Sequence, residues 1–312
     1  MSESWPIETE IQEHCPVCSA RGWQLYPSVV DLYFGTPGEW GVLRCPKRGC
    51  GTIWLNPRPT FASMPMAYMS YYTHETATER QVSRPRVGGV IARLLGLTGA
   101  RESLYMLRAA HLAPGRLLDV GCGNGQRMAA FRDLGWEVFG QEVDDRAAQA
   151  AAQQGLEVFV GQIEEMPISQ PFDLILLNHV IEHVHDPAEL LRECRSRLRR
   201  GGRVLILTPN AHALGRQLYR ERWRGLEAPR HLQVFTGSSL ESLIRATSLT
   251  PVEVFATPVN AQWFAEQWAS LMKLPRGIQK AIGWAAQAFS LGIWLMRRDS
   301  GEELYACAAL VE

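Results

Sequence analysis

The sequence lacks three features, and each absence narrows what the 312-residue chain can be. It has no net charge, because 32 Lys and Arg balance 32 Asp and Glu, and this counts against a polyanion such as nucleic acid as its substrate. The first residues, MSESWPIETEIQEH, show neither a basic segment nor an apolar core, so we expect no signal peptide and a cytoplasmic location. The longest uncharged run, Ala281 to Met296, falls short of the roughly 20 residues that span a bilayer.

Four of the seven cysteines form two close pairs near the N-terminus. Cys15 and Cys18 belong to CPVC, and Cys45 and Cys50 enclose CPKRGC. Two such turns can hold a structural zinc ion, Zn2+, tetrahedrally, although the second pair is more widely spaced than usual. A metal-free relic and two disulfides are the alternatives, and a reducing compartment disfavours the disulfides. The pattern predicts a zinc-ribbon-like domain over residues 1–59.

A glycine-rich stretch, LLDVGCGNGQ, runs from Leu117 to Gln126. Its apolar half predicts a buried strand, and the glycines that follow predict a tight turn whose backbone comes close to a ligand. Residues 126–135 then show the apolar spacing of a helix, so backbone N–H groups at its start would face that ligand. This order predicts a nucleotide-type pocket at the first strand of a doubly wound α/β sheet.

The glycine spacing is G-x-G-x-G after an acid, and not the G-x-G-x-x-G of dinucleotide sites. DVGCGNG resembles the glycine motif of class I methyltransferases, which use S-adenosylmethionine. The resemblance covers residues 113–256 and the last strand, and it implies a Rossmann-like seven-stranded sheet whose last strand is antiparallel. It also implies that Asp119 faces the methionine end of the cofactor, beside the turn residues Gly121, Cys122, Gly123 and Gly125.

A second expected strand, residues 136–140, leads to Glu142, followed by Val143 and Asp144. A carboxylate at this distance from the glycine turn suits a ribose diol, so we assign that contact to Glu142 and rank Asp144 second. The resemblance further places the adenine near Gln162 and Ile163, which follow the third strand. Val143 is a further candidate contact.

The fourth expected strand, residues 172–177, runs into Asn178-His179-Val180-Ile181-Glu182-His183. This segment resembles the corresponding signature of small-molecule methyltransferases, including the ubiquinone-type O-methyltransferases. We place Asn178 at the cofactor, with His183, His231 and His179 as candidate catalytic bases, because a histidine titrates near neutral pH. The alternative is that these histidines only anchor loops.

The chain divides into five expected segments. They are the zinc-ribbon-like domain, a helical lead-in over 60–112, the cofactor-binding core over 113–257, a hydrophobic helical insertion over 258–300 and the final strand over 301–312. In the lead-in, Tyr68, Tyr71, Tyr72 and His74 form either a packing seam or a lid over the site. The insertion is a hairpin packed on the core, a homodimer surface, or an interfacial helix that touches a membrane peripherally, at its inner face.

These patterns together predict an S-adenosylmethionine-dependent methyltransferase that acts on oxygen of a small-molecule, saccharide or lipid-linked acceptor. Five arginines between 216 and 230 would hold a phosphate or carboxylate of that acceptor. One alternative is a zinc-ribbon RNA methyltransferase, which balanced charge and the absence of an N-P-P-Y or D-P-P-R type motif after the fourth strand disfavour. The other is a non-catalytic module that binds the cofactor.

Overall fold

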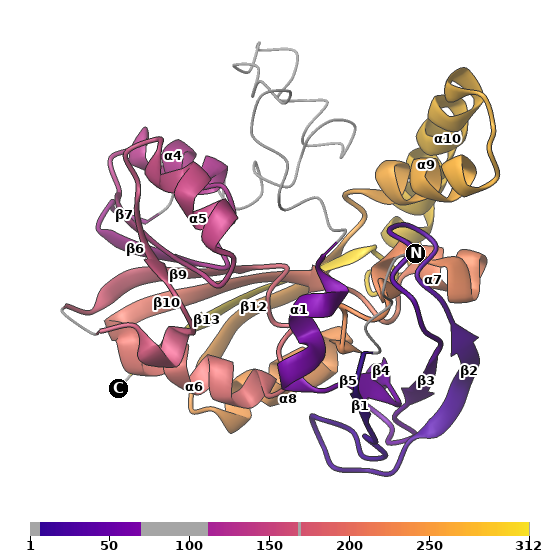
Figure 1. The fold of residues 1–312 in the computed structure, drawn as a ribbon, viewed down its shortest axis with the longest axis horizontal. Helices are drawn as coiled ribbons and strands as arrows, with labels where there is room; N and C mark the ends of the chain where they lie inside the picture. Colours follow the sequence, from indigo (N-terminus) through magenta and orange to yellow (C-terminus); the bar gives the residue numbers. More distant parts are fainter. Residues whose placement is uncertain (1–6, 70–111, 168–169, 312) are drawn as a thin grey trace, which may run out of the picture.

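The computed structural model describes residues 7–69, 112–167 and 170–311. Its centre is a seven-stranded sheet with the strand order β8-β7-β6-β9-β10-β13-β12 (Figure 1). The strands are β6 (Arg116–Val120), β7 (Glu137–Glu142), β8 (Glu157–Val160), β9 (Phe172–Asn178), β10 (Leu198–Pro209), β12 (Thr250–Thr257) and β13 (Glu303–Ala309). Strand β13 is antiparallel to both of its neighbours, whereas β10, β9, β6, β7 and β8 pair in parallel. The expected Rossmann-like sheet with an antiparallel last strand is confirmed.

Apolar side chains on both faces of β9 explain its central position, since a parallel strand is covered on both sides. Ile175 and Leu177 join a core with residues of α6 (Pro187–Arg197) and α8 (Gly237–Ala246). Leu174 and Leu176 face the opposite core, which includes Phe131 of α4 (Gln126–Arg132). Between β7 and β8 runs α5 (Asp145–Ala152), and the turn η3 (Ile163–Glu165) follows β8.

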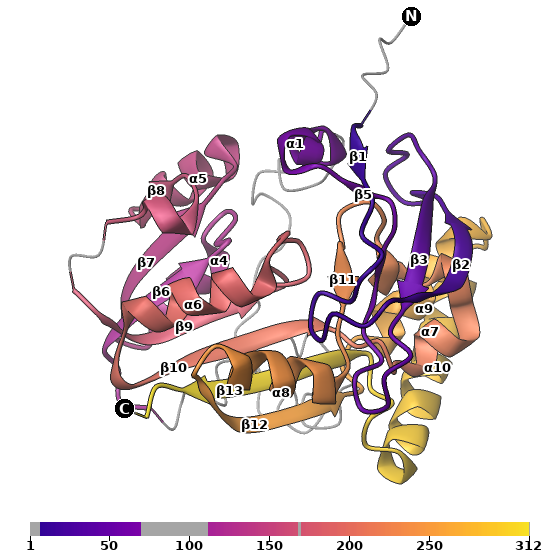
Figure 2. The same ribbon diagram turned by 90° about the horizontal axis from the view of Figure 1, so that it is seen from below.

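The N-terminal region forms a second sheet, with the order β11-β4-β3-β2. Strands β2 (Trp23–Val29), β3 (Trp40–Arg44) and β4 (Ile53–Leu55) are antiparallel, as the ribbon pattern predicts. The fourth strand, β11 (Gln233–Val234), comes from the distant loop that precedes α8 (Figure 2). The short strands β1 (Thr9–Glu10) and β5 (Arg58–Pro59) pair with each other, and η1 (Phe61–Ser63) and α1 (Met64–Ala67) follow them.

One hydrophobic core joins this second sheet to the rest of the molecule. Trp40 and Ile53 of the sheet pack in the same cluster as Trp223, Leu232 and Phe264. Trp223 lies between η4 (Arg220–Arg222) and η5 (Arg224–Leu226), which follow α7 (Leu214–Tyr219). Leu232 lies directly before β11, and Phe264 lies in α9 (Ala261–Leu271). The N-terminal sheet is therefore packed against the central part of the chain through an apolar interface.

The hydrophobic insertion is a hairpin of α9 and the longer α10 (Arg276–Met296), which projects from the molecule (Figure 1). Its base is held by aromatic stacking, with ring centroids 5.5 Å apart for Tyr219 and Trp268. In the described part of the chain, no helix is long and apolar enough to cross a membrane. Tyr71, Tyr72 and His74, with the rest of residues 70–111 of the expected helical lead-in, lie outside the described residues.

Candidate active site

The glycine turn follows the end of β6, and its three glycines all have positive φ, between 57° and 78°. A Cβ atom at Gly125 would lie 2.4 Å from Leu156, and one at Gly121 would lie 2.8 Å from Val180, so packing requires glycine at both. A Cβ atom at Gly123 would meet nothing within 4 Å. Gly123 is thus the point where the backbone faces open space, as a cofactor turn requires.

Glu142, at the end of β7, lies against this turn. Its carboxylate accepts hydrogen bonds from the backbone N–H of Gly123 at 2.7 Å, Val143 at 2.8 Å and Asp144 at 3.0 Å. Burial raises the pKa of Glu142, and the three backbone donors oppose that rise. Asp144 has a different role, because its side chain caps α5. The structure therefore brings Glu142, and not Asp144, to the glycine turn.

Asp119 is buried at the carboxyl end of β6. Both of its oxygens accept from Arg127 Nη1, at 2.9 and 3.0 Å, so its neighbour in this structure is a guanidinium of α4. Burial raises the pKa of Asp119, and the positive charge of Arg127 opposes the rise. The sequence reading missed Arg127, although its place in the first turn of the helix after the glycines was a visible signal.

The other candidate cofactor contacts differ in exposure. Ile163 is buried in the main core, whereas Gln162 is exposed directly before η3. Val143 is exposed, and Asn178 is half-buried at the end of β9. These residues lie in loops or at strand ends near β6 to β9, and no described contact joins them into one surface.

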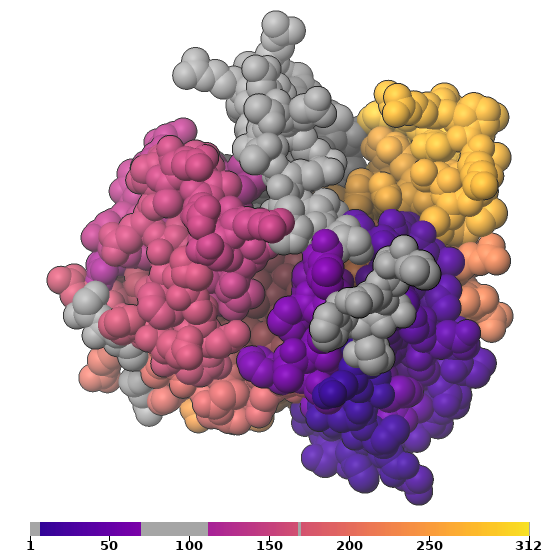
Figure 3. Space-filling view, viewed as in Figure 1, coloured from indigo at the N-terminus to yellow at the C-terminus, as the bar shows by residue number. Residues whose placement is uncertain are grey.

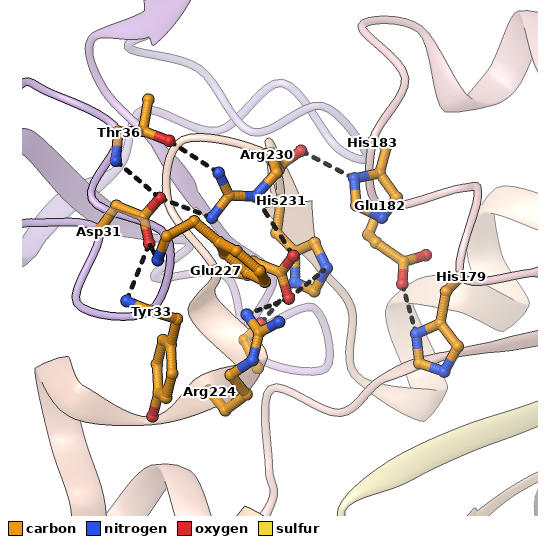
Figure 4. A network of polar contacts seen from close by, with 12 residues as sticks. Asp31, Tyr33, Thr36, His179, Glu182, His183, Arg224, Glu227, Arg230 and His231 are labelled. Atoms are coloured by element: carbon orange, nitrogen blue, oxygen red, sulfur yellow. Dashed lines mark hydrogen bonds and ion pairs between the residues drawn. The ribbon is translucent and has the colours of Figure 1, made fainter. Parts of the chain in front are cut away.

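Glu182, His183 and His231 form what we call the histidine cluster (Figure 4). Their potential ligand atoms all lie within 4.8 Å of one another, and the two imidazole rings meet edge to face with centroids 4.6 Å apart. Glu182 is fully buried and accepts from Thr208 Oγ1 at 3.0 Å. The structure thus brings together two of the three predicted bases, His183 and His231, although they are far apart in sequence.

Hydrogen bonds to neighbouring groups engage Nδ1 of both rings. His231 Nδ1 lies 2.8 Å from the carbonyl oxygen of Gly225, and because a carbonyl only accepts, the neutral ring has its hydrogen on Nδ1 and its lone pair on Nε2. His183 Nδ1 lies 2.8 Å from the Tyr68 hydroxyl, which can donate or accept, and 3.1 Å from the carbonyl oxygen of Arg230. Burial lowers the pKa of His183, and lowers that of His231 to about 4. Both rings are therefore neutral at pH 7 and able to accept a proton.

His179 lies between two buried carboxylates. Its Nδ1 is 2.9 Å from Glu182 Oε1, and its Nε2 is 3.2 Å from Glu303 Oε1. The residue adopts a left-handed conformation, with φ of 54°, at the end of β9. Because both nitrogens are engaged by protein groups, the geometry suits the positioning of Glu182 better than proton transfer from an acceptor.

A second polar group, here called the arginine cluster, contains Asp31, Arg224, Glu227 and Arg230 (Figure 4). Arg230 is fully buried and bonds Asp31 Oδ2 at 2.8 Å and Glu227 Oε1 at 3.3 Å. Arg224 pairs with Glu227 and lies over the Tyr33 ring. The expectation that these arginines bind an acidic acceptor group is wrong, because their charges are neutralised inside the protein.

The remaining arginines of that stretch divide in the same way. Arg216 is buried, and its Nε donates to the carbonyl of Ala211. Arg220 and Arg222 are exposed on η4. The prediction failed for Arg230 because its partner, Asp31, comes from the N-terminal region that packs against this segment. Asp31 is 199 positions away in the sequence, so no local pattern relates the two residues.

Cys15, Cys18, Cys45 and Cys50 form a compact group of four thiols. The sulfur of Cys15 lies 3.7 Å from that of Cys50, and the sulfurs of Cys18 and Cys45 are 3.4 Å apart. These separations exceed a disulfide bond of about 2.05 Å, and they are close to the roughly 3.8 Å edge of a tetrahedral zinc–thiolate site. The backbone N–H of Val17 also points at Cys15 Sγ, at 3.5 Å. The donor set fits a zinc ion.

Comparison with known proteins agrees with this geometry. A model of the Methyltransferase domain family matches residues 98–254, half of the chain. The ubiquinone biosynthesis O-methyltransferase of Caulobacter sp. (strain K31) is 38% identical over 103 residues, 30% of this chain and 41% of that protein. The enzyme of the same name from Cereibacter sphaeroides (strain ATCC 17029) is 31% identical over 164 residues, 47% of this chain and 66% of that protein.

A solved structure from Thermotoga maritima, described as a methyltransferase and possible histamine N-methyltransferase, is 19% identical, with a TM-score of 0.45. The match covers 72% of this chain and 94% of that one. The chain spans from two-fifths to two-thirds of the length of the two curated relatives described above. The parallel sheet with a glycine turn defines an α/β domain of the nucleotide-cofactor type. More particularly, the chain belongs to the methyltransferase domain family.

Proposed function

We propose that this protein transfers the methyl group of S-adenosylmethionine to an oxygen of a small-molecule, saccharide or lipid-linked acceptor. One observation carries the proposal. Glu142 lies against the glycine turn at the end of β7, and His183, which is paired with His231, lies beyond the end of β9, a strand in the parallel part of the same sheet. Ligands of open α/β sheets bind at the carboxyl ends of the strands. The names of the similar ubiquinone O-methyltransferases support oxygen as the acceptor atom.

In this proposal the cofactor lies over the glycine turn. Gly123 offers open backbone, and Glu142 retains one of its about four acceptor positions for a ribose hydroxyl, since three backbone N–H groups use the others. Asp119, together with the Arg127 guanidinium that it holds, is the proposed neighbour of the methionine end. Gln162, Ile163, Val143 and Asn178 are the proposed contacts of the adenine and the rest of the cofactor.

The proposed base is His183. Its Nε2 would take the hydroxyl proton while the acceptor oxygen attacks the methyl carbon, and the carbon–sulfur bond breaks to leave S-adenosylhomocysteine. Most of the acceleration would come from holding oxygen and methyl group in line, and proton removal would add about 10²- to 10⁴-fold. His231 is the second candidate base, and His179 positions Glu182.

The histidine cluster also suits a divalent cation, because Glu182, His183 and His231 offer three ligand atoms within 4.8 Å. A cation there would orient the acceptor hydroxyl and favour its ionisation. Prolonged dialysis against a chelator distinguishes a histidine base acting alone from a bound cation. Methyl transfer that survives the dialysis supports the base alone. Loss of transfer, with recovery by Mg²⁺ or Mn²⁺, supports the cation.

We further propose that the four N-terminal cysteines hold a structural zinc ion. Elemental analysis of the purified protein should give about one zinc per chain, and none after Cys15→Ser together with Cys45→Ser. Thr236, the N-cap residue of α8, donates a hydrogen bond from its Oγ1 to the carbonyl of Cys50. Because this bond joins the cysteine group to α8, zinc loss should also lower the melting temperature. A zinc-free protein of unchanged melting temperature would contradict this role.

The test of the methyl transfer uses S-adenosylmethionine carrying a labelled methyl group. Purified protein is incubated with cell extract that is then separated into lipid, small-molecule and RNA fractions. Label in the lipid or small-molecule fraction, absent with His183→Asn, supports the proposal. Label in RNA would favour the zinc-ribbon RNA enzyme, and cofactor binding by calorimetry without label in any fraction would favour a non-catalytic module.

A further inference from the structure

Helix α10 has its polar and apolar faces reversed relative to an ordinary surface helix. Its buried residues are Gly283, Gln287 and Ser290, spaced four and three apart on one face. Gln287 bonds the N–H of Gln262 and the carbonyl of Pro258. Gly283 lies so close to α9 that an added Cβ would come within 2.7 Å of Glu266. The contact between the two helices is therefore made by small and polar groups.

The opposite face of α10 is apolar and faces outward. Ile278, Trp284, Phe289 and Leu295 are each between 44% and 57% exposed, and Met296 is 75% exposed. A water-facing helix normally carries polar residues there. The hairpin projects from the body of the molecule (Figures 1 and 3), and these five apolar side chains are exposed on it.

The hairpin is also locally cationic. Between Glu266 and Asp299 the sequence contains no acidic residue, and it contains five basic ones: Lys273, Arg276, Lys280, Arg297 and Arg298. Since the whole chain has a net charge of zero, the other residues together carry 0 − 5 = −5. The positive residues lie at the two ends of α10, beside the apolar face and not within it.

We infer that the α9–α10 hairpin binds the surface of an anionic lipid bilayer. An interfacial helix buries its apolar side chains at the boundary of the acyl chains, while lysines and arginines at its edges reach the headgroups. Trp284 and Phe289 suit this boundary, and the basic ends suit acidic headgroups. The 21-residue α10 is long enough to lie in the membrane plane over about 31 Å.

A second copy of the chain fits this face less well. Pairing two apolar faces would bring two sets of five positive charges together without acids from the same segments to neutralise them. A bilayer with acidic lipids meets the apolar face and the charge at once. This inference does not depend on methyl transfer, so its test needs no acceptor.

The test is sedimentation of the full-length protein with vesicles of phosphatidylcholine, with or without phosphatidylserine. We expect binding to the phosphatidylserine vesicles, at least tenfold weaker binding to phosphatidylcholine alone, and loss of binding at high salt. Trp284→Ser with Phe289→Ser should reduce binding at least tenfold, and Arg276→Glu with Lys280→Glu should abolish the preference for acidic lipid. The matched control is Leu134→Ser with Val160→Ser, which changes exposed apolar residues of the central domain and should leave binding unchanged.

Melting curves of the variants separate binding from folding, because all the substituted side chains are partly or wholly exposed. Equal binding by the wild type and the Trp284/Phe289 variant would overturn the inference. Absence of vesicle binding would also overturn the inference. That holds for a monomer, and it holds for a dimer that the Trp284/Phe289 double substitution dissociates. The dimer result would assign the apolar face to a second copy.

Discussion

The arginine cluster and the histidine cluster lie side by side, and Arg230 touches both, since its side chain belongs to the first and its carbonyl oxygen lies 3.1 Å from His183 Nδ1 (Figure 4). In the arginine cluster each buried cation meets a buried carboxylate. In the histidine cluster the Glu182 carboxylate meets Thr208 Oγ1 and His179 Nδ1, and the imidazoles of His183 and His231 lie edge to face beside it. Buried charges that are paired within the protein hold the fold together, whereas a neutral imidazole beside a buried carboxylate is able to take up a proton.

The largest expected effect comes from breaking the arginine cluster. Arg230→Met leaves Asp31 and Glu227 buried without their shared cation, which should lower the free energy of unfolding by about 3 to 5 kcal/mol. Urea denaturation measures it, with the exposed Arg222→Met as the control, for which we expect a change below about 0.5 kcal/mol. Equal stability of the two variants would show that the buried pairs do not hold the N-terminal sheet.

His183→Asn removes an imidazole from the histidine cluster. We expect methyl transfer to fall by about 10²- to 10⁴-fold with little change in melting temperature, because Asn keeps polarity but not the base. Since burial lowers the pKa of His183, the wild-type rate should hold as the pH falls to about 6.5 and decline only in more acidic buffer. A variant with wild-type rate would remove His183 from the mechanism.

His231 makes the stability of the protein depend on pH. Its pKa falls from about 6.5 in the unfolded chain to about 4 in the fold, so the folded protein binds fewer protons between these values. Its contribution to stability is therefore full above pH 6.5 and is lost as the pH falls towards 4, by at most about 3 kcal/mol. Denaturation midpoints across this range measure the loss, and His231→Asn should flatten the curve. An equally steep curve for the variant would assign the pH dependence to other groups.

Glu142→Gln should have the smallest effect. Removing one negative charge while keeping the shape should weaken binding of S-adenosylhomocysteine by about tenfold, or 1.4 kcal/mol. Calorimetry measures the affinity. Asp144→Asn is the control, since Asn can also cap α5, and it should bind as the wild type does. If both variants bind equally well, Glu142 does not contact the cofactor.

Local patterns account for what could be predicted. The glycine turn, the continuous apolar strand β9 and the two cysteine pairs are each encoded within a few neighbouring residues, and all three form as expected. Alternating or periodic burial is a local property, so it can be read from sequence. The partner of Arg230 could not be read in this way, because Asp31 is 199 positions away. Arg127, the neighbour of Asp119, is only eight positions away, and its place in the first turn of α4 makes it readable from the sequence.

Short motifs are enough to identify the class of the fold, the family and the residues able to do chemistry, because they carry the backbone turn and the side-chain types. The use of those residues depends on tertiary contacts. The tertiary structure paired Arg224 and Arg230 with acids inside the protein, and it placed His231 beside His183. It also added β11 to the N-terminal sheet and turned the apolar face of α10 outward. These outcomes depend on contacts between segments far apart in the chain, where burial and charge pairing, and not local propensity, set the free energy.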